Sequence, residues 1–133
     1  MVELKDIVKI DDWKKEKHIP VITLEKEKVN KGEFFELEVT VGKSINHPNT
    51  TAHHIRWISI YFLPDNEEFP YHIVDTTFNA HGESIKGADT STVYSNHTIK
   101  IEFKTEKPGT IIAASYCNIH GLWQSSERIN ISS

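Results

Sequence analysis

The chain contains one cysteine, Cys117, and one methionine, Met1, among its 133 residues. A lone cysteine cannot form an internal disulfide, so the class of small secreted domains stapled by disulfides is excluded. A closed structural zinc site built from several thiolates is excluded for the same reason. Cys117 is therefore either a buried inert thiol or the single sulfur ligand of a metal site.

The chain also lacks a basic excess and a long apolar run. Asp plus Glu number 19 against 15 Lys plus Arg, which gives a net charge of −4 and argues against binding nucleic acid through phosphates. No apolar segment approaches the ~20 residues that cross a bilayer. Residues 1–6 mix charged with apolar side chains, which argues against a signal peptide. We therefore expect a cytoplasmic protein without a membrane partner, in a compartment that keeps its thiol reduced.

The hydrophobic pattern is that of β-structure. Apolar and polar residues alternate over 35–41 and 99–103, as they do in strands with one buried face. Turn signals at Pro64-Asp65-Asn66 and Lys107-Pro108-Gly109 end or begin further strands. The predicted strands cover 19–24, 35–41, 55–62, 71–78, 99–103, 110–117 and 127–131. This number predicts a seven-stranded antiparallel, immunoglobulin-like β-sandwich.

The chain length predicts one domain over residues 1–133, with residues 1–13 as an N-terminal arm. Within the arm, residues 2–13 could hold one short helix. Residues 79–95 are polar and contain glycine, so we expect a long loop there.

Most of the ligand-type residues fall into three short segments. They are Glu16-Lys17-His18, the segment from His47 to His54, and Cys117-Asn118-Ile119-His120-Gly121. Neutral imidazole and thiolate are the ligands that a redox-active transition metal prefers. Each segment lies at the end of a predicted strand, so loops at one end of the sandwich could bring all three together. His53 and His54 are adjacent and should face opposite ways, so we expect at most one of them to face the metal.

Three kinds of site remain open on these residues. A copper carrier needs two histidines, one cysteine and usually a weak axial methionine, but Met1 is the only methionine and two histidines would be left over. A zinc-stabilised loop end would make the chain a binding or structural module. Four imidazoles in a plane with one axial thiolate suit five-coordinate iron and leave one position open for a reactant.

Taken together and in order, the three segments resemble the superoxide reductases of the one-iron, neelaredoxin type. The matching motifs are Glu16-Lys17-His18-Ile19-Pro20-Val21-Ile22, His47-Pro48 with His53-His54-Ile55-Arg56-Trp57-Ile58, and Cys117-Asn118-Ile119-His120-Gly121-Leu122-Trp123. The resemblance spans roughly residues 13–131. Two-iron relatives carry an extra N-terminal domain with a four-cysteine iron centre. No cysteine precedes Cys117, so we expect that domain to be absent.

The resemblance implies a mononuclear non-haem iron and assigns its ligands. The implied set is His18, His47, His53 and His120 in the plane, with Cys117 on the axis. Glu16 resembles the residue that closes onto the sixth position in the resting ferric state, and Lys17 resembles the cation that attracts superoxide. The implied reaction is a one-electron reduction of superoxide to hydrogen peroxide, with re-reduction by an external donor such as rubredoxin. The resemblance also implies a homotetramer, with a dimer as the alternative, assembled by packing of sheets.

Other residues near these segments have simpler interpretations. His54 is expected to be a packed or hydrogen-bonded neighbour, and His72, His81 and His97 are expected to be solvated because none belongs to a cluster. Residues 14–17 form a charge run, and such a run is often a plain polar loop. Backbone N–H groups after Cys117 are expected to hydrogen-bond its sulfur.

Overall fold

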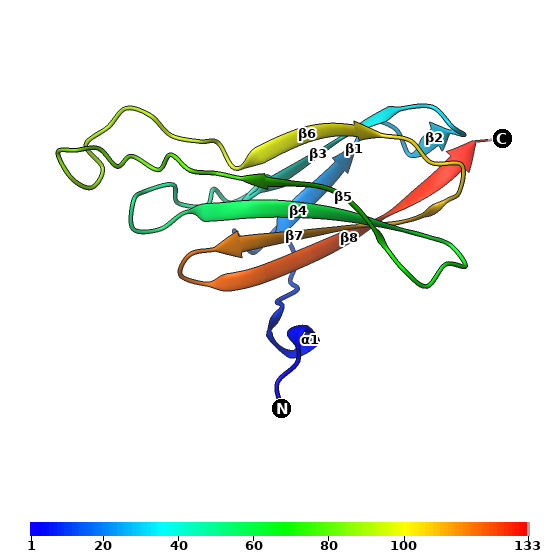
Figure 1. The fold of residues 1–133 in the computed structure, drawn as a ribbon, viewed down its shortest axis with the longest axis horizontal. Helices are drawn as coiled ribbons and strands as arrows, with labels where there is room; N and C mark the ends of the chain where they lie inside the picture. Colours follow the sequence, from blue (N-terminus) through cyan, green and yellow to red (C-terminus); the bar gives the residue numbers. More distant parts are fainter. Residues whose placement is uncertain (133) are drawn as a thin grey trace.

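Eight strands and one short helix make up the computed structural model, which describes residues 1–132 (Figure 1). The elements in chain order are α1 (Leu4–Ile7), β1 (Pro20–Leu24), β2 (Lys28–Asn30), β3 (Phe35–Val41), β4 (Ile55–Pro64), β5 (Tyr71–Thr77), β6 (Thr98–Phe103), β7 (Gly109–Cys117) and β8 (Gly121–Ser132).

The strands form two sheets that face each other. The smaller sheet has the order β1-β3-β6 and the larger has the order β2-β8-β7-β4-β5. All pairs are antiparallel except β2 with β8, which is parallel. The all-β sandwich expected from the sequence is confirmed, with one more strand than expected, the three-residue β2.

The core lies between the sheets and includes the thiol. In β7 every second residue is buried, from Gly109 through Ile111, Ala113 and Ser115 to Cys117. This alternation is the pleat of a strand whose one face is covered, and each fully buried aliphatic residue stabilises the fold by about 2 kcal/mol. Cys117 therefore points to the core side of its sheet, at the strand's last position.

Three loops meet at one end of the sandwich, on the left of Figure 1. They are the connections at 42–54, 78–97 and 118–120, between β3 and β4, β5 and β6, and β7 and β8. Because β4 and β7 pair with Ile55 opposite Cys117, the segment before Ile55 lies beside the turn that follows Cys117. This pairing brings the second and third histidine-bearing segments together.

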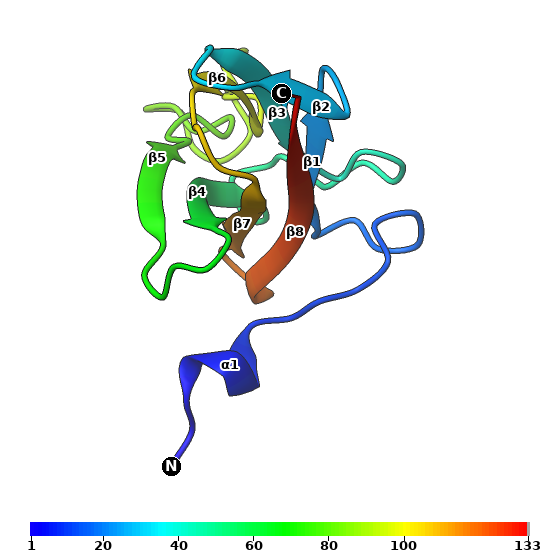
Figure 2. The same cartoon turned by 90° about the vertical axis from the view of Figure 1, so that its right-hand side faces the viewer.

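The N-terminal arm projects from the body (Figure 2). Its attachment is at Lys9, whose N–H donates to the Leu122 carbonyl at 2.9 Å and whose carbonyl accepts from the Gln124 N–H at 3.0 Å. The helix α1 has a capping box but no buried residue. An expected short helix within 2–13 is confirmed, although it spans only one turn.

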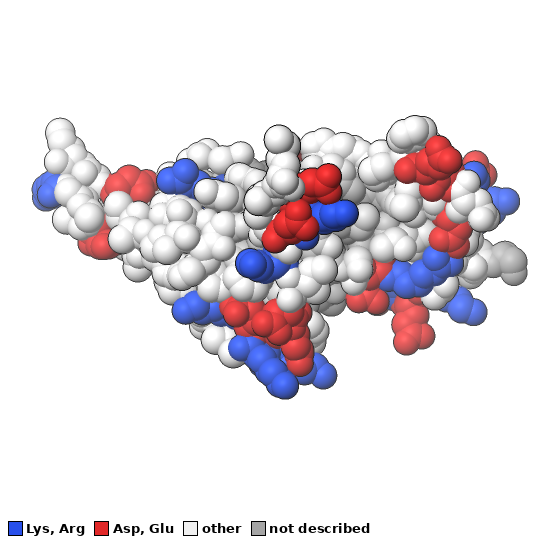
Figure 3. All heavy atoms as spheres, turned by 90° about the horizontal axis from the view of Figure 1, so that it is seen from below, with Lys and Arg blue, Asp and Glu red and all other residues white. Residues whose placement is uncertain are grey.

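The surface carries both signs of charge. Lys and Arg are interspersed with Asp and Glu on the face shown in Figure 3, with no extended area of one sign. No helix in the described residues has the length and apolar character needed to cross a membrane.

Candidate metal centre

Three parts of the chain contribute side chains to one compact group. One potential ligand atom from each of His18, His47, His53 and Cys117 lies within 4.8 Å of the others. His18 precedes β1, His47 and His53 lie between β3 and β4, and Cys117 ends β7. The sequence expectation that the strand ends converge is met for these residues.

The four expected imidazoles form a ring. The centroid distances around it are 4.9 Å for His18–His47, 4.7 Å for His47–His53, 5.0 Å for His53–His120 and 4.7 Å for His120–His18. The diagonal His18–His53 distance is longer, at 6.2 Å. Near-equal sides with a longer diagonal describe a closed four-membered ring, in which each imidazole has two others as neighbours.

His120 closes this ring through its Nδ1 atom. That nitrogen lies 3.0 Å from His18 Nε2 and 3.2 Å from His53 Nε2. It also lies 3.8 Å from Cys117 Sγ. The five residues predicted to hold the metal through nitrogen or sulfur are therefore neighbours in the fold.

The sulfur lies on the protein side of the ring. Cys117 is fully buried, whereas His53 is half-buried and His120 is exposed. The backbone N–H of His120 donates to Cys117 Sγ at 3.4 Å, as expected for a thiolate that is tuned by backbone donors. The ring is thus nearer to solvent at His53 and His120, whereas His18 and His47 are buried.

His18 is oriented from three directions. Its ring N–H at Nδ1 donates to Glu16 Oε1 at 2.5 Å, and its backbone N–H donates to the same oxygen at 3.0 Å. Its ring stacks on Trp123 at 4.7 Å with 12° between the planes, and its carbonyl accepts from Ser115 Oγ at 3.4 Å. Because Nδ1 carries the proton, Nε2 presents its lone pair to the ring of histidines. A carboxylate behind a histidine is a common orienting partner of metal-bound imidazole.

The hydrogen bonding of His47 shows whether this cluster of side chains suits a metal ion. Its Nδ1–H donates to the Pro48 carbonyl at 2.6 Å, so its Nε2 is an acceptor. That Nε2 is buried and has no hydrogen-bond partner within the described residues. An unpaired buried acceptor costs about 1–3 kcal/mol. A cation at the centre of the ring would satisfy it, so the donor set fits a metal such as iron.

Burial keeps these imidazoles neutral. It lowers the pKa of His47 to about 3, against a partly compensating hydrogen bond to Pro48. Burial also lowers the pKa of His18 and of His53, and neighbouring histidines add to the effect. Neutral imidazole is the form that binds metal, so few protons compete for the site at neutral pH.

These shifts predict how pH affects the metal-free protein. The folded pKa values lie below the unfolded value of about 6.5, so the stability from neutral histidines is complete above pH 6.5. For buried His47 it is then lost as the pH falls toward 3, by about 1.4 kcal/mol per pH unit. His18 and His53 add to the loss in the same direction. We expect the Tm of the metal-free protein to fall from pH 6.5 downward in thermal circular dichroism. A Tm that stays constant from pH 6.5 to 5 would contradict this.

The loop that carries His47 and His53 is held by the loop between β5 and β6. The Thr51 N–H donates to Asp89 Oδ1 at 2.9 Å, and the Asp89 N–H donates back to Thr51 Oγ1 at 3.1 Å. At the start of the 42–54 loop, Gly42 has a φ of +79°, and a Cβ there would lie 2.6 Å from the backbone nitrogen of His47. Glycine is therefore required for this loop to turn back against its own residue 47.

Three more histidines pack near the ring, and two of them, His81 and His97, were expected to be solvated. His54 is buried, as predicted, and its ring stacks on His81 at 3.5 Å with 8° between the planes. His97 packs edge-on against His47 at 5.9 Å. The prediction that His81 and His97 are solvated is wrong, since His81 is only 7% exposed and His97 is half-buried. Its burial follows from the fold of 78–97 over the His54 segment, which sequence spacing does not show; His72 is exposed as predicted.

Glu16 and Lys17 lie beside the ring. Glu16 is half-buried, and its carboxylate contacts His18. Burial opposes its ionisation, but hydrogen bonds from His18 outweigh this and lower the pKa of Glu16. Lys17 is half-buried and directly precedes His18, and its charge helps to lower the pKa of both His18 and His53.

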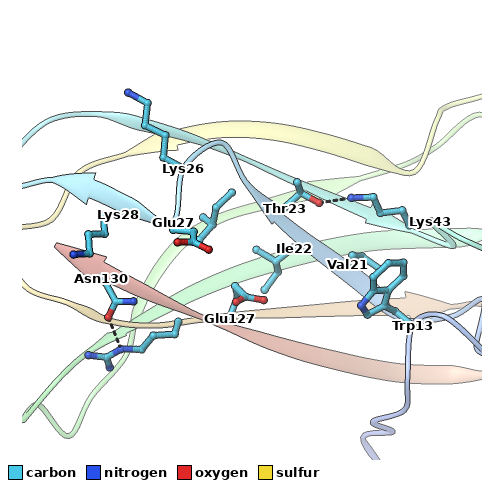
Figure 4. A pocket seen from close by; sticks show the side chains of 12 residues that line it. Trp13, Val21, Ile22, Thr23, Lys26, Glu27, Lys28, Lys43, Glu127 and Asn130 are labelled. Carbon is cyan, nitrogen blue, oxygen red and sulfur yellow. Dashed lines mark hydrogen bonds between the residues drawn. The ribbon is translucent and has the colours of Figure 1, made fainter. Parts of the chain in front are cut away.

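A separate hollow lies along β1 and the far half of β8 (Figure 4). It has a volume of 560 Å³, and Trp13 stands at one end of it. Glu27 and Glu127 are interspersed with lysines, one of which, Lys43, donates to Thr23 Oγ1 at 2.6 Å. None of the histidines or Cys117 lines it, so it is not part of the metal centre.

Comparison with known proteins gives one consistent family. The desulfoferrodoxin family model matches residues 10–126. Superoxide reductase from Pyrococcus furiosus is 49% identical over 122 residues, which cover 92% of this chain and 95% of the relative. Neelaredoxin from Megalodesulfovibrio gigas is 45% identical over 128 residues, which cover 96% and 98%. A solved Thermotoga maritima structure has a TM-score of 0.96 at 50% identity and covers 100% of both chains.

Proposed function

The chain belongs to the desulfoferrodoxin family, with superoxide reductases and neelaredoxin among its near relatives, and on this basis we propose that it is itself a superoxide reductase. It is an oxidoreductase that acts on superoxide. The reaction takes one superoxide, one electron and two protons to one hydrogen peroxide, and so removes a damaging radical. The observation that carries the proposal is the ring of four imidazoles that lies against one buried thiol.

The proposed cofactor is one non-haem iron. We assign its ligands as His18, His47, His53, His120 and Cys117. The unpaired His47 Nε2 and the approach of His120 Nδ1 to its neighbours support this set. Nothing in the family or its relatives supports a copper carrier, and four convergent imidazoles exceed what a two-histidine copper site uses.

Each neighbouring residue has a defined task in the reaction. Iron bound here would supply the electron by passing from its ferrous to its ferric form. The Cys117 thiolate, buried at the end of β7, would donate electron density to it. Lys17 presents a positive charge on a chain of net charge −4 and so attracts the superoxide anion locally. The exposure of His120 keeps water, and hence protons, close to the reacting face.

Glu16 has two proposed positions. With its carboxylate on His18, as here, it orients that imidazole and would not itself bind the metal. In the resting ferric state we propose that it closes onto the sixth position. That movement gives up two hydrogen bonds, one to the ring and one to the backbone of His18.

Replacing Lys17 with alanine should slow the reaction with superoxide. Loss of the local positive charge removes electrostatic attraction, so we expect the second-order rate constant to fall by about tenfold and its dependence on salt to flatten. Pulse radiolysis at several ionic strengths measures both. Lys15→Ala is the matched control, because Lys15 belongs to the same charge run but is exposed. A rate constant equal to that of the wild type would leave Lys17 as an ordinary surface lysine.

The function itself is tested by metal analysis and rapid mixing. We expect iron in the purified protein, a broad visible band in the oxidised form that bleaches on reduction, and fast consumption of superoxide by the reduced form. The metal-free chain is the control and should be inactive. A colourless zinc protein, or a metal-free chain that consumes superoxide equally fast, would overturn the proposal.

The electron donor and the assembly are further parts of the proposal. We propose an external donor protein such as rubredoxin and a homotetramer of chains, each a single domain with residues 1–13 as its arm. Support for assembly comes from the arm, where Val2, Leu4 and Ile10 are each more than 65% exposed. Sedimentation measurements would give the number of subunits.

A further inference from the structure

Asn118 connects two segments that carry ligands. Its side-chain carbonyl Oδ1 accepts from the His54 N–H at 2.9 Å, and its Nδ2–H donates to the Ala52 carbonyl at 2.9 Å. Its own backbone N–H donates to the His54 carbonyl at 3.1 Å. Three hydrogen bonds from one residue thus bracket His53 on both sides.

The position of Asn118 gives these bonds a consequence for the metal centre. Asn118 follows Cys117 directly, whereas Ala52 and His54 flank His53, so the amide fixes the distance between a thiolate and an imidazole of the centre. The side-chain amide uses its oxygen as an acceptor and its nitrogen as a donor. Neither a carboxylate nor an aliphatic side chain can provide both. The His54 ring is itself fixed, since it stacks on His81 and its Nδ1–H donates to the Thr50 carbonyl at 2.9 Å.

We propose that Asn118 is a positioning residue that holds His53 in register with Cys117 before the metal binds. This inference rests on the proposed metal centre and adds a residue that is not itself a ligand. Ligands already held in place lose less conformational freedom on binding, so the bound metal leaves more slowly. Loss of an outer partner of this kind typically costs about 10–100-fold in metal affinity.

The test compares Asn118→Ala, Asn118→Asp and the control Asn30→Ala. Asn30 lies on β2, away from the centre, and also loses side-chain hydrogen bonds, to Glu33 and Ser132. We expect ferrous iron to pass to an excess of chelator about 10–100-fold faster from Asn118→Ala. Asn118→Asp keeps the acceptor for His54 and should lie between Asn118→Ala and the wild type. Asn30→Ala should release iron at the wild-type rate.

Thermal unfolding separates positioning from general stability. If Asn118 positions ligands, the gain in Tm on adding ferrous iron should shrink in Asn118→Ala but not in Asn30→Ala. A Tm that falls equally with and without iron, together with an unchanged release rate, would overturn the inference. The cobalt(II)-loaded variants provide a spectroscopic check, since a displaced His53 should shift the thiolate-to-cobalt band.

One measurement needs no variant. In metal-free wild-type protein, the His54 amide should exchange its hydrogen slowly, because its acceptor on Asn118 is already in place. Exchange at the rate of an unprotected peptide would overturn the inference. None of these readouts uses superoxide, so the positioning role and the enzymatic activity can fail independently.

Discussion

Replacing Cys117 with serine is expected to abolish the visible band of the oxidised protein and to remove most of its activity. The band arises from charge transfer between a thiolate and ferric iron, and a hydroxyl group cannot replace the sulfur in it. Cys117 is fully buried at the end of β7, so the smaller oxygen would also lie farther from the ring of imidazoles. Loss of the axial electron donation should slow the electron transfer that follows superoxide binding.

The measurement is a visible spectrum of the ferric protein together with its iron content. The four imidazoles remain in Cys117→Ser, so we expect iron to bind more weakly but the fold to persist, as circular dichroism will show. Cys117→Ala is a companion variant that removes the side-chain donor altogether. If the same band survives in either variant, Cys117 is not the axial ligand.

The second large effect is expected from His47→Leu, which should weaken the iron-loaded protein far more than the metal-free protein. With iron, the variant loses one of the proposed ligands, and its affinity for iron should fall by more than the roughly 100-fold that loss of an outer partner can cost. Without iron, leucine removes a buried acceptor that has no partner. Such an acceptor costs about 1–3 kcal/mol, but leucine also removes the Nδ1–H that donates to the Pro48 carbonyl, a hydrogen bond that contributes about 0.5–1.5 kcal/mol. Because the two changes offset each other, the metal-free variant should be about as stable as the metal-free wild type.

Chemical denaturation with and without iron measures both effects. His72→Leu is the control, because His72 is exposed on β5 and lies outside the ring. It should leave the iron-dependent gain in stability unchanged. A His47→Leu protein that gains as much stability from iron as the wild type would show that His47 does not bind it.

The sequence predicts most of the fold because the strands of the core have a strong pattern. β3 matches its predicted range because its apolar residues alternate strictly with polar ones. β2 is missed because only Val29 of its three residues is apolar and buried, and its pairing with β8 is decided elsewhere in the chain. The first half of β8 is missed for a similar reason. Its Gln124-Ser125-Ser126 segment has no apolar alternation, and it is a strand because β7 provides the backbone partners.

The candidate site is predicted where residue type carries the information. Histidine and cysteine are typical metal ligands, so the segments that contain them can be found in the sequence, and the turn after Cys117 places His120 close by. The residues that support the ligands cannot be found by their type. Asn118 is an ordinary turn residue until the fold places Ala52 and His54 against it. His81 has no neighbouring ligand in the sequence, and only the path of the 78–97 loop buries it on His54.

The most direct test of the account is the stoichiometry of the reaction between superoxide and the reduced, iron-loaded protein. Reduction predicts one hydrogen peroxide for each superoxide consumed, one ferrous centre oxidised, and no oxygen released. A single-turnover experiment that measures the peroxide formed, the oxygen released and the ferrous iron oxidised gives these three quantities. Release of one oxygen for every two superoxides, with the iron left unchanged, would identify a dismutase and contradict the account.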